Sequence, residues 1–179
     1  LERRAAVSET TRSAENAALR GSVLEWVDAE GMAVVCAYVP MGGEPGSREL
    51  LDALRERGTR VLLPIVVRGG PLGWAEYFGP DSLRPATFGL LEPTSTRLGS
   101  EAIAEADGVL VPALAIDQRG VRLGQGAGYY DRSLPKAGPV PLVGVVRDTE
   151  FVEELPGEAH DVRVGGVLTP GRGLVLLPV

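Results

Sequence analysis

Apolar residues occur along this chain in short continuous runs that are separated by more polar, amphipathic segments. Three of the runs are almost entirely aliphatic, at residues 32–39, 60–67 and 108–112. Continuous apolar runs of this length indicate strands that are buried on both faces, as in a parallel sheet. Shorter apolar stretches predict further strands at residues 73–78, 140–146, 165–168 and 174–177.

Helix signals fall between these predicted strands. Ser8 is a suitable N-cap for an amphipathic helix over residues 8–28, and Ser47 for a second helix that extends to Arg57. The other expected segments are short helices at residues 99–106 and 129–134 and a mostly irregular segment at residues 79–98. The alternation of strands and helices is typical of an α/β protein.

The chain length is close to that of one ordinary domain, and no internal repeat or low-complexity linker divides the sequence. We therefore expect one domain over residues 1–179, with the three-layer α/β/α architecture and a mainly parallel central sheet. Hydrophobic residues make up 44% of the chain, which is enough for a sizeable core.

Charge and hydropathy exclude several classes of protein. The net charge of −6 gives no sign of a general affinity for nucleic acid or for anionic membranes. No apolar run approaches the roughly 18 residues of a transmembrane helix, and the first 15 residues contain no apolar signal core. We expect a cytoplasmic protein that binds neither nucleic acid nor membrane.

Side chains that commonly carry catalysis are scarce, because the chain has one histidine, one cysteine and one lysine: His160, Cys36 and Lys136. A structural zinc site is excluded because it needs about four ligands of the His and Cys type. Lys136 does not lie in a Walker A motif, and the sequence contains no Gly-x-Ser-x-Gly motif of a hydrolase. The remaining means of catalysis are backbone amides, arginines, carboxylates and a hard metal ion.

One glycine-rich segment has the composition of a phosphate site. Gly124, Gly126 and Gly128 occupy every second position in the segment between a predicted strand and a predicted helix. Glycines allow the backbone N–H groups to approach an anion closely. Arg122 can clamp a phosphate, and Asp131 suits a hard cation such as Mg²⁺. A turn that merely connects a strand to a helix would explain the glycines alone, but it would need neither Arg122 nor Asp131. The spacing does not fit the Gly-x-Gly-x-x-Gly fingerprint of dinucleotide-binding proteins.

The segments Val111-Pro-Ala-Leu-Ala-Ile-Asp117, Gly120-Val-Arg-Leu-Gly124 and Gly128-Tyr-Tyr-Asp-Arg132 resemble the signature of the 5-formyltetrahydrofolate cyclo-ligase family. Four shorter pieces also resemble the family in order along the chain. They are Tyr38-Val-Pro-Met-Gly-Gly-Glu44, Leu63-Pro64, Phe88-Gly89 with Glu92-Pro93, and Pro156-Gly-Glu-Ala-His160-Asp161 followed by Thr169. The similarity extends from about residue 33 to residue 170.

The resemblance implies an enzyme that converts 5-formyltetrahydrofolate and ATP to 5,10-methenyltetrahydrofolate, ADP and phosphate, with Mg²⁺ as the metal. It implies that the formyl oxygen attacks the γ-phosphate to give an iminophosphate, and that the nitrogen at position 10 then displaces phosphate. Alignment and charge stabilisation suffice for such steps, which agrees with the scarcity of His, Cys and Lys. The expected partner is the folate, with or without a polyglutamate tail, and we expect a monomer.

The resemblance also assigns roles to residues one by one. Arg122, Tyr129 and Asp131 are the implied catalytic residues, and Asp131 and Asp161 are the implied Mg²⁺ ligands. ATP is expected to contact Arg122, Leu123, Gly124, Gln125, Gly126, Ala127, Gly128, Tyr129 and Tyr130. The folate is expected to contact Val39, Glu44, Gln125, Gly126, Ala127, Gly128 and Tyr129.

Several of these residues have simpler explanations. Without the resemblance, Glu44 would be read as a solvated loop carboxylate and Asp161 as a surface turn residue. Trp74 and Tyr77 lie on opposite faces of a predicted strand, and burial is the expected role of Trp74, with stacking on the pterin as the alternative. Asp117 fits a family position but also fits an ordinary turn before a glycine.

Two departures from the family pattern concern the nucleotide. Family members usually begin with a helix that carries Lys and Arg toward the nucleotide, and we expect either that this chain starts after that segment or that Arg3 and Arg4 substitute for it. Ala127 stands in the glycine-rich segment, where it would tolerate a positive φ poorly. Two rival functions therefore stay open: a non-catalytic relative that binds nucleotide or folate, and a different ATP-dependent activating enzyme.

Overall fold

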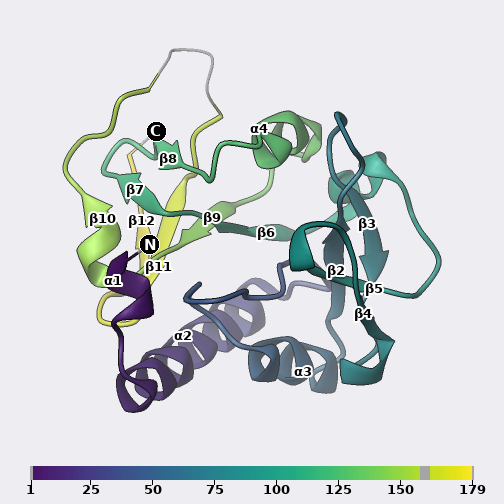
Figure 1. Ribbon diagram of the computed structural model, residues 1–179, viewed down its shortest axis with the longest axis horizontal. Coiled ribbons are helices and arrows are strands. Elements are labelled where there is room, and N and C mark those ends of the chain that lie inside the picture. Colours follow the sequence, from purple (N-terminus) through teal and green to yellow (C-terminus); the bar gives the residue numbers. More distant parts are fainter. Residues whose placement is uncertain (1, 158–161, 179) are drawn as a thin grey trace.

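The computed structural model describes residues 2–157 and 162–178 of the chain. A seven-stranded sheet forms its centre, with the strand order β12-β11-β9-β6-β1-β2-β3 (Figure 1). The five inner strands run parallel, and the edge strands β12 and β3 are antiparallel to their neighbours. The predicted mixed α/β fold with a mainly parallel sheet is confirmed.

The sheet strands are β1 (Val34–Cys36), β2 (Arg60–Ile65), β3 (Gly73–Glu76), β6 (Gly108–Pro112), β9 (Leu142–Val145), β11 (Gly166–Thr169) and β12 (Gly173–Leu176). A small sheet consists of β7 (Ala115–Asp117), β8 (Arg122–Leu123) and β10 (Phe151–Val152), and a hairpin of β4 (Leu83–Pro85) and β5 (Leu91–Pro93). The α-helices are α1 (Glu2–Ala5), α2 (Glu9–Glu30), α3 (Arg48–Glu56) and α4 (Tyr129–Ser133). The 3₁₀ helices are η1 (Pro80–Ser82), η2 (Thr87–Gly89), η3 (Ser100–Glu105), η4 (Leu134–Lys136) and η5 (Asp148–Glu150).

The two long helices begin and end where the sequence indicates. The hydroxyl of Ser8 accepts a hydrogen bond from the backbone N–H of Thr11, and Gly31 ends α2 in the left-handed conformation. The hydroxyl of Ser47 accepts a hydrogen bond from the backbone N–H of Leu50 at the start of α3. Side-chain caps thus fix both N-termini, as the sequence predicts.

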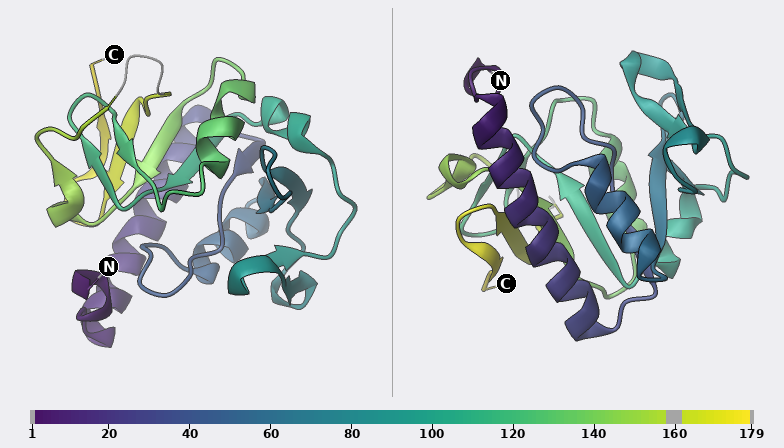
Figure 2. Two further views of the ribbon diagram at one scale, coloured as in Figure 1. Left: turned by 45° about the horizontal axis from the view of Figure 1, so that its top comes forward. Right: turned by 90° about the horizontal axis from the view of Figure 1, so that it is seen from below.

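The sheet separates two hydrophobic clusters. Helices α2 and α3 cover one face of the sheet, as the view from below in Figure 2 shows, and Leu19, Leu51 and Leu54 pack there. The opposite face is covered by η3, α4 and the small sheet, and it buries Trp74 and Ile103. This second layer is built from shorter elements than expected, since the helix predicted at residues 99–106 is a 3₁₀ helix.

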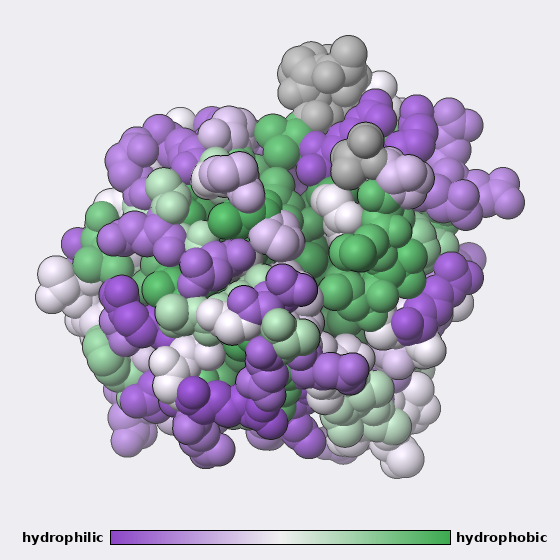
Figure 3. Space-filling view, turned by 180° about the vertical axis from the view of Figure 1, so that it is seen from behind, coloured by the Kyte–Doolittle hydropathy of each residue, from purple (hydrophilic) through white to green (hydrophobic). Residues whose placement is uncertain are grey.

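The surface over the back of the molecule carries polar side chains over most of its area, with apolar side chains showing between them (Figure 3). Within the described parts of the chain, none of the helices is long and apolar enough to cross a membrane.

Candidate functional site

The candidate site lies where the parallel strands β1, β6 and β9 end, because their carboxyl ends share one edge of the sheet. The glycine-rich loop, residues 118–128, follows β7 and leads into α4. Its arm β8 returns to this edge, since the N–H of Leu114 donates to the carbonyl of Leu123 at 2.8 Å. The sequence predicts a phosphate site in this segment, between a buried strand and a helix, although the small sheet that supports it was not predicted.

Asp117 holds the start of the glycine-rich loop. Its side chain is fully buried, and its carboxylate accepts hydrogen bonds from the backbone N–H groups of Arg119, Val121 and Leu155 at 2.8 to 3.0 Å. Burial alone would raise the pKa of Asp117, but these N–H donors and the Arg119 guanidinium outweigh it, so that the pKa lies below its ordinary value. Asp117 is therefore an ionised organiser of the loop, as the turn interpretation of the sequence proposes.

Arg122 projects from β8 into the protein and remains mostly buried. One terminal nitrogen of its guanidinium donates to the carbonyl of Pro112 at 2.9 Å, and the other lies 3.4 Å from the carboxylate of Asp131. The guanidinium carbon lies 5.5 Å from the centre of the Tyr130 ring. The Nε atom of Arg122 is buried and has no hydrogen-bond partner among the described residues. The guanidinium is thus held in place by protein groups, and its buried Nε keeps one donor without a described partner.

The glycines of the loop allow this packing. A side chain at Gly124 would come within 3.1 Å of the Arg122 guanidinium. Gly126 and Gly128 have φ angles of 101° and 77°, which L-residues with side chains rarely adopt. Ala127 between them is not among the residues with a positive φ, so the strain that the sequence raised at this position is avoided.

Helix α4 is anchored to the turn before β3 by its own polar side chains. The buried hydroxyl of Ser133 donates to the carbonyl of Tyr129 at 2.6 Å and accepts from the N–H of Leu72 at 2.8 Å. Arg132 donates to the carbonyl of Gly70 and stacks on the ring of Tyr129. These contacts fix the position of Tyr129, which the sequence predicts to face both substrates, although the sequence analysis did not single out Ser133.

Asp131 is the predicted Mg²⁺ ligand that lies among the described residues. Its side chain is 66% exposed at the edge of the loop, and its long contact with Arg122 leaves carboxylate oxygens available. A Mg²⁺ ion in a nucleotide site commonly takes one or two carboxylates and completes its shell with phosphate oxygens and water. The donor set at Asp131 fits such an ion. The residues described here contain no cluster of three or more side chains of the metal-ligating type, and Asp161 and His160 lie outside them.

Two of the predicted folate contacts, Val39 and Glu44, lie on the loop between β1 and α3, whereas the others lie on the glycine-rich loop and at the start of α4. Val39 is buried, and the carboxylate of Glu44 accepts a hydrogen bond from the N–H of Met41 at 2.8 Å. Burial raises the pKa of Glu44 and outweighs the Met41 N–H and the charge of Arg4, which lower it. Glu44 is therefore a partly desolvated carboxylate and not the freely solvated side chain that the simpler interpretation predicts.

Tyr130 lies beside Arg122, with the centre of its ring 5.5 Å from the guanidinium carbon. Its hydroxyl is buried and has no hydrogen-bond partner among the described residues. Burial raises the pKa of Tyr130, and the negative charge of Glu44 raises it further, whereas Arg122 lowers it. The phenol therefore stays neutral beside the Arg122 guanidinium.

The chain is similar to known proteins both in sequence and in fold. The model of the 5-formyltetrahydrofolate cyclo-ligase family matches residues 1–170. The chain belongs to this family. The sequence-based identification of a cyclo-ligase family enzyme is therefore confirmed.

Relatives of the cyclo-ligase family support the assignment over the whole chain. The chain is 48% identical to a 5-formyltetrahydrofolate cyclo-ligase of Mycolicibacterium smegmatis, over 99% of this chain and 93% of the relative. It is 30% identical to the cyclo-ligase of Escherichia coli, over 77% of this chain and 78% of that protein. The NMR structure of an Aquifex aeolicus 5,10-methenyltetrahydrofolate synthetase superposes with a TM-score of 0.83 at 27% identity, and it covers 99% of this chain and 89% of that one.

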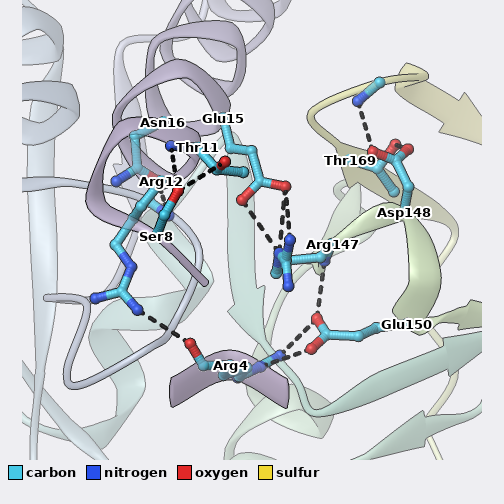
Figure 4. A network of polar contacts seen from close by, with 12 residues as sticks. Arg4, Ser8, Thr11, Arg12, Glu15, Asn16, Arg147, Asp148, Glu150 and Thr169 are labelled. Carbon is cyan, nitrogen blue, oxygen red and sulfur yellow. Dashed lines mark hydrogen bonds and ion pairs between the residues drawn. The ribbon is translucent and has the colours of Figure 1, made fainter. Parts of the chain in front are cut away.

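The two N-terminal arginines of this cyclo-ligase family member, Arg3 and Arg4, differ in their exposure to solvent. Arg3 is exposed. Arg4 is buried and pairs with Glu150, as Figure 4 shows, so its guanidinium is already occupied by protein groups. Sequence reasoning raised Arg4 only as a substitute nucleotide contact, and nothing in the local sequence indicates that its partner is Glu150.

Trp74 and Tyr77 are both fully buried, on opposite faces of the sheet, as the strand alternation predicts. The hydroxyl of Tyr77 donates to the carboxylate of Asp52 at 2.7 Å. The expectation that Trp74 is a core residue agrees with its complete burial.

Proposed function

We propose that this chain catalyses the ATP- and Mg²⁺-dependent cyclisation of 5-formyltetrahydrofolate to 5,10-methenyltetrahydrofolate, with release of ADP and phosphate. Membership of the cyclo-ligase family supports the overall reaction. The observation that carries the nucleotide part is the buried guanidinium of Arg122, which lies against Gly124 with its Nε unpaired among the described residues. A guanidinium close to the exposed residues 125–127 suits a phosphate group.

In the proposed reaction, the formyl oxygen attacks the γ-phosphorus of ATP, and the bond between that phosphorus and ADP breaks. The nitrogen at position 10 then attacks the activated formyl carbon and loses its proton, and the five-membered ring closes. The phosphorylated oxygen leaves as phosphate. These steps depend on alignment and on neutralisation of negative charge, and they need no nucleophilic side chain.

The segment from Arg122 to Asp131 supplies the nucleotide and metal contacts in this proposal. Arg122 neutralises phosphate charge, and the backbone from Leu123 to Tyr130 cradles the nucleotide. Asp131 would hold Mg²⁺, which when bound offsets the negative charge of the phosphate oxygens. Tyr129 is held by the anchored helix α4, where it would align the folate with the nucleotide.

The loop between β1 and α3 supplies the folate side of the proposal. Glu44 would accept hydrogen bonds from the donor-rich edge of the pterin, and its partial burial would strengthen them. Val39 would provide apolar contact. We also propose that the protein is a monomer and that it accepts folates with or without a polyglutamate tail.

A direct assay tests the proposed reaction. The protein is incubated with 5-formyltetrahydrofolate, MgATP and buffer, and the absorbance of methenyltetrahydrofolate is followed, with controls that omit ATP or replace Mg²⁺ by a chelator. The expected result is that methenyltetrahydrofolate forms only when both ATP and Mg²⁺ are present. ATP binding without product would favour the non-catalytic relative, and ATP turnover only with another acid would favour a different activating enzyme.

A further inference from the structure

Arg4 occupies a buried position between segments that are distant in sequence. Its side chain is only 4% exposed, and its guanidinium forms two parallel hydrogen bonds with the carboxylate of Glu150 at 2.8 and 2.9 Å. The same guanidinium donates to the carbonyl of Ala113, directly after β6. A buried bidentate pair with a third backbone contact has a fixed geometry, unlike an exposed ion pair.

The backbone around Arg4 also touches the loop that carries Glu44. A side chain at Gly43 would come within 2.7 Å of the Cβ atom of Arg4 and within 3.2 Å of its backbone, so Gly43 packs directly on α1. The carbonyl of Arg4 accepts a hydrogen bond from Arg12 on α2 at 3.0 Å (Figure 4). The position of Arg4 is thus tied to the loop between β1 and α3.

Glu150 connects Arg4 to the glycine-rich loop through a series of backbone contacts. Its carboxylate also accepts the N–H of Arg147 at 2.8 Å, which fixes η5. The chain then continues into β10, which pairs with β7 in parallel register. Just beyond β10, the N–H of Leu155 donates to Asp117, the organiser of the loop. The link from Arg4 to Asp117 therefore runs through contiguous strands and hydrogen bonds.

We infer that Arg4 is a positioning residue that sets the glycine-rich loop and the loop between β1 and α3 at the correct separation for reaction. It acts through Glu150 and Ala113 on one side and through Gly43 on the other. The inference rests on the proposed function, because it assumes that nucleotide and folate occupy these two loops. A positioning role differs from direct contact with ATP, since it requires Glu150 as much as Arg4.

The test compares the variants Arg4→Gln, Arg4→Lys and Glu150→Gln with the wild type. Arg57→Gln is the matched control, because it removes the same charge from an exposed arginine at the end of α3, away from both loops. Arg4→Lys retains the charge but cannot form the bidentate pair. Steady-state kinetics with each substrate varied are measured well below the melting temperatures. Amide hydrogen exchange of residues 41–46 and 113–128 is measured in the absence of substrates.

The expected result is a loss of about ten- to a hundredfold in kcat/KM for both substrates in all three variants, because small misplacements of reacting groups are costly. Exchange should accelerate in both loops, whereas Arg57→Gln should leave exchange and kinetics unchanged. The double variant Arg4→Gln with Glu150→Gln should lose no more kcat/KM than either single variant, because the two residues act as one pair.

Two results would overturn the inference. In the first, kcat/KM falls for ATP alone and only in the Arg4 variants, which would make Arg4 a nucleotide contact. In the second, kinetics and loop exchange are unchanged although the melting temperature falls, which would make the pair merely structural. If the wild type lacks cyclo-ligase activity, the proposed function fails, but hydrogen exchange still reports whether Arg4 and Glu150 couple the two loops.

Discussion

Arg4 and Arg122 donate hydrogen bonds to neighbouring carbonyl groups, those of Ala113 and Pro112. The two residues come from α1 and β8, and both reach the carboxyl end of β6, where the candidate site begins. Arg122 keeps an unpaired donor, whereas the guanidinium of Arg4 is paired with Glu150. One arginine is therefore suited to a ligand, and the other to holding the protein around it.

The variant Asp117→Asn should lose about 2–4 kcal/mol of unfolding free energy near neutral pH, because an amide cannot accept all of the N–H donors around this fully buried group. Chemical denaturation measures the loss. Asp81→Asn is the matched control, since Asp81 is exposed.

The same variant should also change the pH dependence of stability. The folded-state pKa of Asp117 is lowered from 3.8, so its ionised form stabilises the fold above that value, and the benefit is lost as the pH falls through the lowered pKa. The difference between wild type and Asp117→Asn should shrink on acidification. A difference that is constant from pH 7 to pH 3 would show that the charge of Asp117 is unimportant.

The variant Gly128→Ala should be destabilised by about 1–2 kcal/mol, because alanine is strained at a φ of 77°. The new methyl group would also meet the Arg132 guanidinium at 2.7 Å and disturb the loop, so nucleotide affinity should fall. Gly21→Ala makes the same chemical change within α2, where no atom lies within 4 Å, and it should be neutral or stabilising. Equal effects of the two variants on unfolding would contradict the loop geometry.

The variant Asp131→Asn should lower Mg²⁺-dependent kcat/KM by about a hundredfold or more. Its thermal unfolding should be unchanged, because the side chain is exposed and makes only a long contact with Arg122. Activity is measured against Mg²⁺ concentration, with Asp81→Asn as the control of equal charge. Full turnover by Asp131→Asn would show that the metal is held elsewhere.

The variant Glu44→Gln should be more stable than the wild type near neutral pH. The folded-state pKa of Glu44 is raised above its ordinary 4.5, so the fold favours the neutral carboxyl, and stability falls as the pH rises through that raised pKa. The gain from glutamine should therefore disappear well below pH 4.5, where glutamate is protonated in both states. Melting temperatures across this pH range measure the effect.

The same substitution should weaken folate binding. Loss of a charged acceptor should raise the KM for 5-formyltetrahydrofolate about tenfold or more and leave the KM for ATP nearly unchanged. An unchanged folate KM with higher stability would mean that Glu44 does not contact the folate.

Much of the fold follows from local signals. Ser8 and Ser47 mark helix starts that the structure reproduces, and the aliphatic run at Gly108–Pro112 is the central strand β6. The small sheet was not predicted because β7, β8 and β10 have only two or three residues each, too few for a periodic pattern. The segment at residues 79–98 was expected to be mostly loop, but it contains the hairpin of β4 and β5.

The candidate site was predictable to the extent that its residues are contiguous in sequence. The glycines, Arg122 and Asp131 lie in one segment, and their residue types indicate a phosphate and metal site without a structure. The pair of Arg4 and Glu150 was not predictable, because it joins opposite ends of the chain through the tertiary fold. Ser133 was missed for the same reason, since its partner Leu72 belongs to another turn.

The central claim is that the glycine-rich loop binds the phosphates of the nucleotide, and amide chemical shifts test it most directly. A non-hydrolysable ATP analogue with Mg²⁺ is titrated into the isotope-labelled protein, and each backbone amide is followed by NMR. The account predicts the largest shifts at Gly124, Gly126, Gly128 and Tyr129, with little change in α3. Saturable binding that shifts a different region and leaves these amides unchanged would contradict it.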